Sequence, residues 1–346
     1  MSGGVDSSVA AALLVQQGYE VIGMMLRLWS EAGMEAGNRC CTPDSMALAR
    51  RVAARLGIPF YAVDAQGVFY DRVVNYFMDG YEEGITPNPC LVCNRNIRWD
   101  FLFERAKSLG ADYLATGHYA RIDKEEGKKF QLLRAIDSKK DQSYVLHVLN
   151  QDLLTQTLFP LGLYTKTEVR QMASKFDLPV AERSDSQDLC FLGDESYRDF
   201  LRRNAPQVVS PGPILTRDGN QLGEHQGLAF YTIGQRKGIG VSSPIPLYVV
   251  HKDRNSNALI VGPSEHLGTK ELIAASINWI AGEAPREEIM ADVKIRYKSR
   301  DERSTVTPLD NQRARVTFDK LIRDITPGQA AVFYDRDRCL GGGIIQ

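Results

Sequence analysis

The first residues of the chain combine glycines, hydroxyls and one carboxylate directly ahead of an apolar segment that predicts a helix. The stretch reads Met1-Ser2-Gly3-Gly4-Val5-Asp6-Ser7-Ser8. Paired glycines let a backbone turn closely around an anion, and the hydroxyls and the amino end of the next helix add donors. Asp6 suits a phosphate-bound Mg²⁺ ion. The Gly-Lys-Ser/Thr ending of the Walker loop is missing, so residues 2–8 predict an ATP pyrophosphate loop of another kind.

Three cysteines lie in two polar segments that could carry reactive thiols. Cys90 and Cys93 follow two prolines and precede a predicted helix, whose amino end can lower the pKa of a thiol. Cys190 comes from a second polar segment at 184–193. We predict that at least one thiol of the first segment is reactive and that both segments could meet over the phosphate loop. The other cysteines are interpreted as packing residues: Cys40, Cys41 and Cys339.

The elements that must position these groups alternate between helix and strand in the first half. This order predicts an α/β fold with a parallel sheet and helices on both faces. The predicted helices are 8–17, 44–56 and 94–109, and the predicted strands are 19–28, 60–63 and 113–116. Ligands bind at the carboxyl ends of such strands, which places Leu26 and Gly117 at the nucleotide pocket. Only Met1 precedes the loop, so we expect the first strand of the sheet to be missing and the true start to lie upstream.

The second half of the chain has a different sequence pattern. A Gly- and Pro-rich stretch at 208–222 and short β patterns at 247–251 and 259–261 predict a small, mainly β linking domain. Alternating runs at 295–297, 314–318 and 330–334 predict a C-terminal β-barrel. We therefore divide the chain into a catalytic domain at 1–194, a central linking domain at 195–268 and an RNA-contacting barrel at 269–346.

The composition sets limits on location and partners. The chain has 346 residues, of which 43% are hydrophobic, and a net charge of −1. No apolar run reaches the length of a membrane helix and no signal peptide precedes the loop, so a cytoplasmic location with reduced cysteines and no membrane partner is expected. The near-neutral charge means that any RNA contact must come from local basic patches.

Six motifs in one order resemble the tRNA-specific 2-thiouridylase (MnmA/TrmU) family of the ATP pyrophosphatase, or PP-loop, superfamily. They are SGGVDSS at 2–8, TPNPCLVCN at 86–94, GHYAR at 117–121, KDQSY at 140–144, CFLG at 190–193 and TIGQRKG at 232–238. The resemblance covers the whole chain. It implies ATP- and Mg²⁺-dependent replacement of oxygen by sulfur at C2 of wobble uridine 34 in tRNAs for Lys, Glu and Gln, with AMP and pyrophosphate released. It also implies a cysteine desulfurase or sulfur-carrier protein as partner.

The resemblance implies roles for individual residues. Cys190 receives a persulfide, and Cys93 is the partner nucleophile that either releases sulfide, leaving a Cys93–Cys190 disulfide, or supports direct attack. Two histidines are interpreted from the residues around them in the sequence. His118 either donates a hydrogen bond to phosphate or orients a strand end, and His147 lies in the core. The predicted tRNA contacts, with His118, are Asn88, Pro89, Cys90, Lys140, Asp141, Gln142, Arg296, Tyr297 and Gln329.

Several alternatives remain open at this point. Many relatives have aspartate where this chain has Cys90, so an acid–base role is not carried over to that position. Cys90, Cys93 and Cys190 could instead hold a [4Fe–4S] cluster that binds sulfide, and a structural zinc that also uses Cys40 and Cys41 is a further alternative. An ATP-dependent amide synthetase of the same fold predicts ammonia or amino-acid dependence without sensitivity to Cys93→Ser or Cys190→Ser. A non-catalytic RNA- or cluster-binding protein predicts no AMP release.

Overall fold

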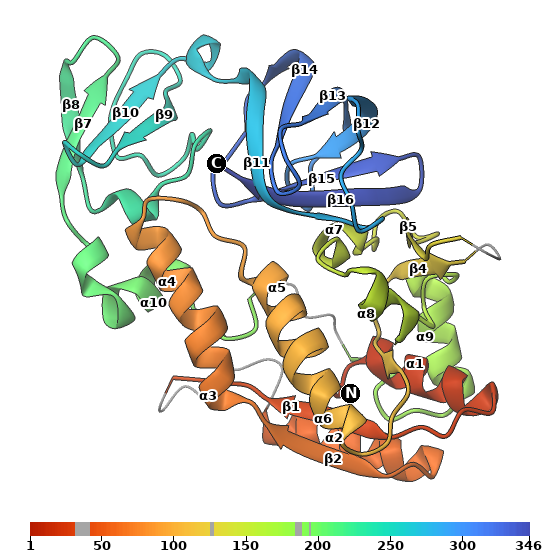
Figure 1. Ribbon diagram of the computed structural model, residues 1–346. Coiled ribbons are helices and arrows are strands. Elements are labelled where there is room, and N and C mark those ends of the chain that lie inside the picture. Colours follow the sequence, from red (N-terminus) through yellow and green to blue (C-terminus); the bar gives the residue numbers. More distant parts are fainter. Residues whose placement is uncertain (32–41, 125–127, 184–188, 194) are drawn as a thin grey trace.

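The computed structural model describes residues 1–31, 42–124, 128–183, 189–193 and 195–346. Figure 1 shows the parallel strands and their helices below, a small β domain at the upper left and a β-barrel at the upper right. In the described part of the chain, no helix has the length and apolar character needed to cross a membrane.

The lower part carries the phosphate loop and the helices that support it. The predicted helix at 44–56 is confirmed, because the Thr42 side chain caps its amino end and Gly57, at φ 67°, ends it. The helices are α1 (Val5–Gln16), α2 (Pro43–Leu56), α3 (Gln66–Phe69), α4 (Asn75–Glu82), α5 (Pro89–Val92), α6 (Phe103–Lys107), α7 (Ser143–Leu146), α8 (Gln151–Thr155), α9 (Lys166–Lys175) and α10 (Tyr197–Asn204), with π-helical turns at Tyr70–Val74 and Cys93–Leu102.

The strands of this part pair in parallel, as predicted, but they form two separate pairs. β1 (Gly23–Arg27) pairs with β2 (Phe60–Asp64), and β3 (Leu114–Ala115) pairs with β6 (Thr157–Leu158). Within the described ranges no strand joins these two pairs. β1 is also shorter than the predicted strand at 19–28, because residues 17–19 still close the end of α1 through backbone hydrogen bonds.

The helical stretch that carries Cys93 begins earlier than predicted. Instead of starting at residue 94, it starts at Pro89, because proline suits the first helical position and the Asn88 side chain accepts a hydrogen bond from the Cys90 N–H at 3.2 Å. It continues through the π-helical turn Cys93–Leu102 into α6. Cys90 and Cys93 therefore both lie in the first turns of one continuous helical segment.

The central part forms its own small sheet. Strand β10 pairs in parallel with β7 and antiparallel with β9, while β8 pairs with β7. The bounds are β7 (Gly212–Thr216), β8 (Gln221–His225), β9 (Tyr248–Asp253) and β10 (Ala258–Gly262). Ile214, Val249 and Leu259 of this sheet belong to the same apolar core as Phe77 and Phe200 of the helical part, so the two parts are packed together.

The C-terminal strands close into the predicted barrel. They are β11 (Thr269–Trp279), β12 (Ile289–Lys294), β13 (Glu302–Pro308), β14 (Ala314–Ile322), β15 (Ala330–Asp335) and β16 (Arg338–Ile345). Pairing runs in the order β11-β14-β13-β12-β15-β16, and β11 pairs with β16 to complete the circle. The predicted strand at 295–297 is wrong. β12 ends at Lys294, and Arg296 begins a turn in which its N–H and carbonyl both bond the Ser299 side chain.

A hairpin from the catalytic part extends the barrel sheet. β4 (Ala120–Asp123) pairs with β5 (Gln131–Arg134), and β5 pairs with β16 through Leu132 and Cys339. One apolar core joins the two parts, containing Trp99 and Tyr144 on one side and Tyr334 on the other. His147 is 2% exposed in the same region, which confirms its predicted core position. The barrel is thus fixed to the part of the chain that holds the phosphate loop.

Candidate active site

The phosphate loop is a tight turn at the amino end of α1. Gly3 has φ 70°, and a Cβ there would lie 2.4 Å from the Ser45 carbonyl oxygen, so only glycine fits the turn. Gly4 precedes Val5, the first residue of the helix, and no side chain caps that end. The amino end of α1 is therefore left with backbone N–H groups that can face an anion.

The hydroxyl groups of the loop differ in position: one supports the turn, and two lie at its more exposed side. The buried Ser8 side chain donates to the Gly4 carbonyl at 2.8 Å. The Ser7 hydroxyl accepts from the Ser2 N–H at 3.0 Å and lies 3.2 Å from the Ser2 hydroxyl. Ser8 therefore holds the turn, whereas Ser2 and Ser7 lie at its more exposed side, where a phosphate can replace their mutual contact.

Asp6 is the centre of the charged contacts in the loop. Its carboxylate accepts from the Tyr119 hydroxyl at 2.8 Å and from the Lys166 Nζ at 2.7 and 2.8 Å. A carboxylate that already binds a cation, and is only partly exposed, fits the oxygen ligand that Mg²⁺ prefers. Asp6 is therefore the residue of this loop that would hold the ion.

The two predicted strand-end residues lie at the rim of the parallel strands. Gly117 follows β3, and a Cβ there would meet the Asp6 carbonyl carbon and the Ser7 nitrogen, each at 2.8 Å. Leu26 lies near the carboxyl end of β1 and packs partly buried against the apolar cores. The structure thus brings Gly117 into contact with the phosphate loop and leaves Leu26 on the same rim.

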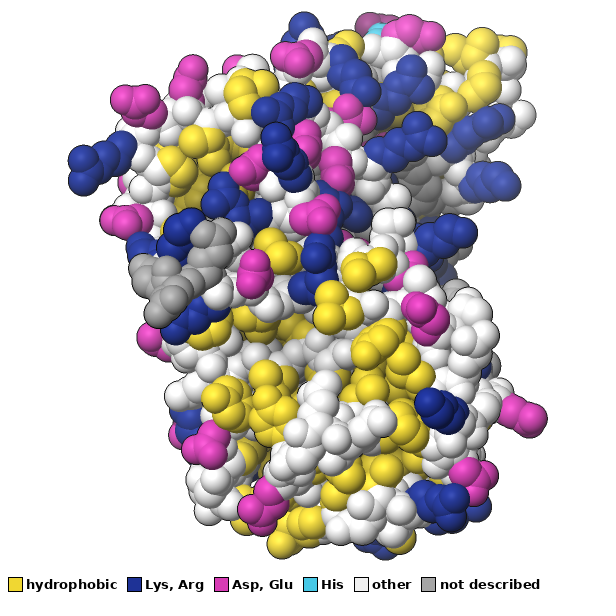
Figure 2. Space-filling view, turned by 90° about the vertical axis from the view of Figure 1, so that its right-hand side faces the viewer, with side chains coloured by type: hydrophobic (Ala, Val, Ile, Leu, Met, Phe, Trp, Pro, Cys, Tyr) yellow, Lys and Arg dark blue, Asp and Glu magenta, His cyan; other side chains and the backbone are white. Residues whose placement is uncertain are grey.

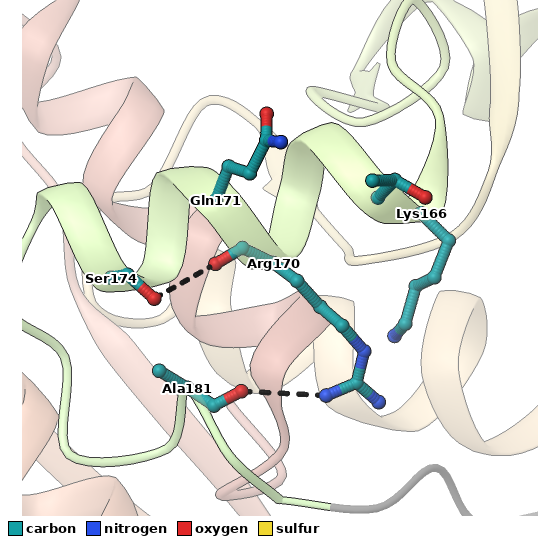
Figure 3. Close-up of a pocket in the computed structure, with 6 residues that line it drawn as sticks. Lys166, Arg170, Gln171, Ser174 and Ala181 are labelled. Atoms are coloured by element: carbon teal, nitrogen blue, oxygen red, sulfur yellow. Dashed lines mark hydrogen bonds between the residues drawn. The ribbon is translucent and has the colours of Figure 1, made fainter.

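A pocket of about 350 Å³ opens beside the loop on the surface of α9. Figure 3 shows Lys166 and Arg170 extending from the same side of this helix. Its lining residues are Lys166, Thr167, Arg170, Gln171, Ser174 and Ala181. Lys166 contributes to both the pocket and the Asp6 contact, so the basic surface of α9 continues into the phosphate loop.

Two of the candidate thiols share one apolar core. Cys93 and Cys190 are half-buried and pack against the same cluster, which includes Leu28 and Phe191. Cys90 is exposed at the first turn of α5. Cys339 is different, because burial raises the pKa of its thiol to about 12. Its predicted packing role fits this burial.

Metal coordination by the cysteines finds no support in their arrangement. Across the described ranges, no three or more His, Cys, Asp or Glu side chains gather closely enough to hold a metal ion. Cys90, Cys93 and Cys190 are thus not assembled as a ligand set for a [4Fe–4S] cluster, and no step is derived through one. Cys40 and Cys41 lie outside the described residues, as do residues 184–188 of the second predicted segment.

The barrel holds the segment that leads to Cys90. Gln329 donates through its side-chain amide to the Thr86 carbonyl at 2.8 Å, and the Thr86 N–H donates to the Pro327 carbonyl at 2.9 Å. A Cβ at Gly328 would lie 2.8 Å from the same Thr86 carbonyl oxygen. This close contact between loops 243 positions apart sets where Asn88, Pro89 and Cys90 lie relative to the barrel.

Two further predicted RNA contacts of the barrel lie next to that segment. Tyr297 is 37% exposed, and burial, followed by the charges of Asp141 and Cys90, raises the pKa of its hydroxyl. Arg296 is half-buried and donates to the Thr326 hydroxyl at 2.8 Å. Tyr297 therefore presents a partly exposed ring that lies against Tyr144, with ring centroids 6.2 Å apart, while Arg296 braces the loop that carries Gln329.

The KDQSY segment connects the phosphate loop to the barrel. Asp141 is 6% exposed and accepts from the Ala135 and Ser143 N–H groups and the Ser143 hydroxyl. Gln142 bonds the Tyr119 backbone in both directions, at 2.8 and 2.9 Å. Lys140 is half-buried at the start of the segment. These contacts make Asp141 and Gln142 supports of the site.

The geometry of His118 fits the second of its two predicted roles, the orientation of a strand end. Its ring stacks on Trp99 at 5.8 Å, and Nδ1 lies 2.8 Å from the Thr116 hydroxyl. Burial, and then the charge of Arg98, lowers the pKa of His118 to about 3. A neutral, stacked imidazole orients the strand end.

Sequence reasoning missed Lys166, Arg183 and the role of Tyr119. Tyr119 stands within the GHYAR motif, but its contact with Asp6 spans 113 positions. Lys166 lies within the Thr165–Glu168 capping box, which predicts a helix start and says nothing about a partner 160 positions away. No local pattern could have identified these contacts.

Family models and known proteins match the chain along its length. The models are described as "tRNA methyl transferase HUP domain" at residues 1–194, "tRNA methyl transferase PRC-barrel domain" at 198–263 and "Aminomethyltransferase beta-barrel domain" at 269–345. The chain is similar to "tRNA-specific 2-thiouridylase MnmA 1" of Caldanaerobacter subterraneus subsp. tengcongensis, at 48% identity over 350 residues, covering 100% of this chain and 96% of that protein.

Two further relatives have the same name. "tRNA-specific 2-thiouridylase MnmA" of Moorella thermoacetica is 48% identical over 353 residues, covering 100% of this chain and 98% of that protein. The MnmA of Natranaerobius thermophilus is 47% identical over 351 residues, covering 100% of this chain and 95% of that protein. With the phosphate loop, the paired thiols and the barrel in one molecule, the chain belongs to the tRNA-specific 2-thiouridylase (MnmA) family.

Proposed function

We propose that this chain is a tRNA-uridine 2-sulfurtransferase that replaces oxygen by sulfur at C2 of uridine 34 in tRNAs for Lys, Glu and Gln. The observation that carries the proposal is the combination in one chain of a phosphate loop centred on Asp6 with Cys93 and Cys190 packed on one core. Family membership supports tRNA as the substrate. We place the reaction in the cytoplasm, where tRNA is available and thiols stay reduced.

The first step activates the base with ATP. The C2 oxygen of uridine attacks the α-phosphorus, the new P–O bond forms and the bond to the β-phosphate oxygen breaks, so pyrophosphate leaves. The turn at Gly3 and Gly4 and the amino end of α1 stabilise the charge of the departing pyrophosphate. Asp6 would hold Mg²⁺, which would neutralise part of that charge together with the Lys166 ammonium that contacts this carboxylate.

The second step delivers sulfur. Cys190 carries a persulfide received from a cysteine desulfurase or a sulfur-carrier protein. The Cys93 thiolate attacks the Sγ of Cys190 and breaks the persulfide S–S bond, so sulfide is released and a Cys93–Cys190 disulfide forms. Sulfide then attacks C2, and AMP leaves with the former uridine oxygen. In the direct variant, the terminal sulfur of the persulfide attacks C2 and AMP leaves with the former uridine oxygen. The Cys93 thiolate then attacks the Sγ of Cys190 and breaks the S–S bond, which frees the thiolated base and forms the Cys93–Cys190 disulfide. A thiol reductant reopens the disulfide in either case.

The tRNA would lie against the face shared by the barrel and the segment at Asn88–Cys90. Gln329 holds this segment through Thr86, and the partly exposed ring of Tyr297 can stack against a base that has left the anticodon loop. Figure 2 shows Lys and Arg side chains interspersed with Asp and Glu side chains in the upper half of one face, where the barrel lies. Individual Lys and Arg side chains of this kind can bind phosphates despite the net charge of −1.

The experiment is thiolation of unmodified tRNA with ATP and either free sulfide or a desulfurase plus cysteine. We expect AMP, pyrophosphate and 2-thiouridine with the desulfurase, and no thiolation by Cys93→Ser or Cys190→Ser. Cys339→Ala is the matched control, because its buried thiol is unreactive and its loss should leave the rate unchanged. AMP release that needs ammonia or an amino acid, and persists in both serine variants, would favour the amide synthetase instead.

Iron analysis of the anaerobically purified protein separates the two sulfur mechanisms. An iron-free enzyme that thiolates with the desulfurase supports the persulfide on Cys190. Near-stoichiometric iron, with activity on free sulfide that follows the iron content, would replace it by a cluster at the cysteines.

A further inference from the structure

One ion pair joins the barrel turn that carries Tyr297 to the β4–β5 hairpin of the catalytic part. The hairpin lies against the barrel through the pairing of β5 with β16 (Figure 1). The turn at 296–301 connects β12 to β13, and Asp301 is its last residue. The Nη2 of Arg134, at the end of β5, lies 2.7 Å from the Oδ2 of Asp301. The turn therefore has a charged contact with the part of the chain that holds the phosphate loop.

The Arg134 side chain is largely removed from solvent. It is 18% exposed, and its Cζ lies 3.6 Å from the centre of the Tyr334 ring, which is itself fully buried. In the described part of the chain, no acceptor meets the Arg134 Nη2 at a hydrogen-bonding angle, so charge rather than direction holds the pair with Asp301. Two charges that are partly shielded from water attract each other more strongly than an exposed pair does.

The backbone around Arg134 is fixed on both sides. Its N–H donates to the Asp337 carbonyl at 2.8 Å, and its carbonyl accepts from the Arg121 Nε at 2.6 Å. The next N–H, that of Ala135, donates to the buried Asp141 carboxylate at 3.0 Å. Arg134 therefore reaches the barrel turn from a firmly held position.

Charged side chains hold the turn at its two ends. At the first end, Arg296 donates to the hydroxyl of a neighbouring barrel loop at 2.8 Å. At the other end, Asp301 contacts Arg134. Tyr297 lies between these ends, and its partly exposed ring lies 6.2 Å from the ring of Tyr144. Of the two charged contacts, the one with Arg134 fixes the turn relative to the catalytic part.

The turn also concentrates positive charge. Arg296, Lys298 and Arg300 alternate with other residues along it, and the side chains of Lys298 and Arg300 are exposed. Mutual repulsion of these cations favours a more open turn. Asp301 is the one carboxylate in the sequence of the turn, so its pair with Arg134 opposes that opening.

We propose that Arg134 and Asp301 are a positioning pair for tRNA, which holds the 296–301 turn so that the Tyr297 ring stands ready to stack against the displaced base. The inference rests on the proposed function, because it concerns how the tRNA contact of Tyr297 is placed. Neither member of the pair touches the base. The pair acts through the turn, so its loss should weaken recognition of tRNA and leave the binding of ATP unchanged.

The test measures the KM for tRNA and the KM for ATP in Asp301→Asn and in Arg134→Gln. The two changes shift the net charge in opposite directions, so an effect that both share cannot come from electrostatic attraction of the tRNA. We expect the KM for tRNA to rise about fivefold in each variant, because the ring is displaced, while the KM for ATP stays the same.

Glu283→Gln is the matched control. Glu283 forms another ion pair between the hairpin and the barrel, with Lys129 at 3.1 Å, but both side chains are exposed and lie away from the turn in the sequence. We expect both KM values to stay unchanged in this control, since exposed pairs contribute little.

A double-mutant cycle tests whether the pair acts through Tyr297. Tyr297→Ala alone should raise the KM for tRNA about tenfold, which is within the range that loss of base stacking gives. Combined with Asp301→Asn, it should raise this KM no further, because a ring that is absent cannot be displaced. Independent effects would instead multiply to about fiftyfold.

Three results would overturn the inference. The first is a KM for tRNA that does not rise in both variants of the pair, and the second is a multiplied effect in the double variant. A purely structural role for the pair predicts the third: lower thermal stability with the KM values for tRNA and ATP raised equally.

Two further points keep the test decisive. If Asp301→Asn does not fold, Arg134→Gln takes its place in the cycle with Tyr297→Ala, and a multiplied effect there would again count against the inference. An unchanged KM for tRNA in Tyr297→Ala would remove the contact that the pair is inferred to place. Failure of the proposed function is distinct, because it appears as no thiolation of tRNA by the unchanged protein with either sulfur source.

Discussion

The contact between Gly117 and the phosphate loop can be tested by one added methyl group. In Gly117→Ala the new Cβ would lie 2.8 Å from both the Asp6 carbonyl carbon and the Ser7 nitrogen, whereas ordinary contacts begin at 3.4 Å. Both neighbours are backbone atoms, so no side chain can rotate away. Since Gly117 is not among the glycines with positive φ, alanine can adopt its conformation and the cost is steric.

The new Cβ would be about 0.6 Å closer to these two atoms than an ordinary van der Waals contact allows. Either the strand end or the first turn of α1 must move by that distance. Overpacking of this kind lowers the free energy of unfolding by about 1–3 kcal/mol. The same shift moves the Asp6 carboxylate and the backbone donors of the loop. Because a misplacement of about 1 Å can cost about 100-fold in rate, we expect kcat/KM for ATP to fall at least about tenfold.

The assay is pyrophosphate release with saturating tRNA and varied ATP, alongside urea denaturation. Gly67→Ala is the matched control, because Gly67 lies within α3 and a Cβ there meets nothing within 4 Å. We expect this control to keep its ATP kinetics and to gain about 0.5–1 kcal/mol of stability. A Gly117→Ala enzyme with unchanged ATP kinetics and unchanged stability would refute the packing of this strand end against the loop.

Three other perturbations probe the supports of the site. Tyr119→Phe removes a hydrogen bond to the Asp6 carboxylate, so the KM for ATP should rise about tenfold at unchanged KM for tRNA; equal effects on both would contradict this assignment. Gln329→Ala frees Thr86 from the barrel and should raise the KM for tRNA several-fold while the KM for ATP stays the same, and a change in the ATP value alone would be the opposite of our expectation. Burial lowers the pKa of His147 to about 4. Between about pH 6.5 and about pH 4, His147 is therefore protonated in the unfolded chain and neutral in the folded chain. The free energy of unfolding should then fall as the pH falls through this range. His147→Gln should flatten part of that slope in urea denaturation at about pH 5 and about pH 7.5, and an unaltered slope would show that His147 does not contribute to it.

Local sequence was sufficient where local chemistry decides the structure. The cap at Thr42, the stop at Gly57 and the turn at Gly3 each depend on residues within a few positions, and each could be read directly. The barrel strands at 314–318 and 330–334 were also predictable, because alternation of inward and outward side chains follows from strand geometry. Predictions were poorer at the ends of elements, as at Pro89 and Lys294.

The functional residues divide in the same way. Sequence by itself determined the phosphate loop and the family to which the chain belongs, since these depend on residue types at short, fixed spacings, and the reactivity of Cys93 and Cys190 stays a prediction. Only the tertiary structure decided that Asp6 is shared by Tyr119 and Lys166, and that Arg183 donates to the Gly3 carbonyl. These contacts join residues more than 100 positions apart. They exist because the packing of α1 against α9, and of the β5 hairpin onto the barrel, brings those residues together, and no local pattern encodes that packing.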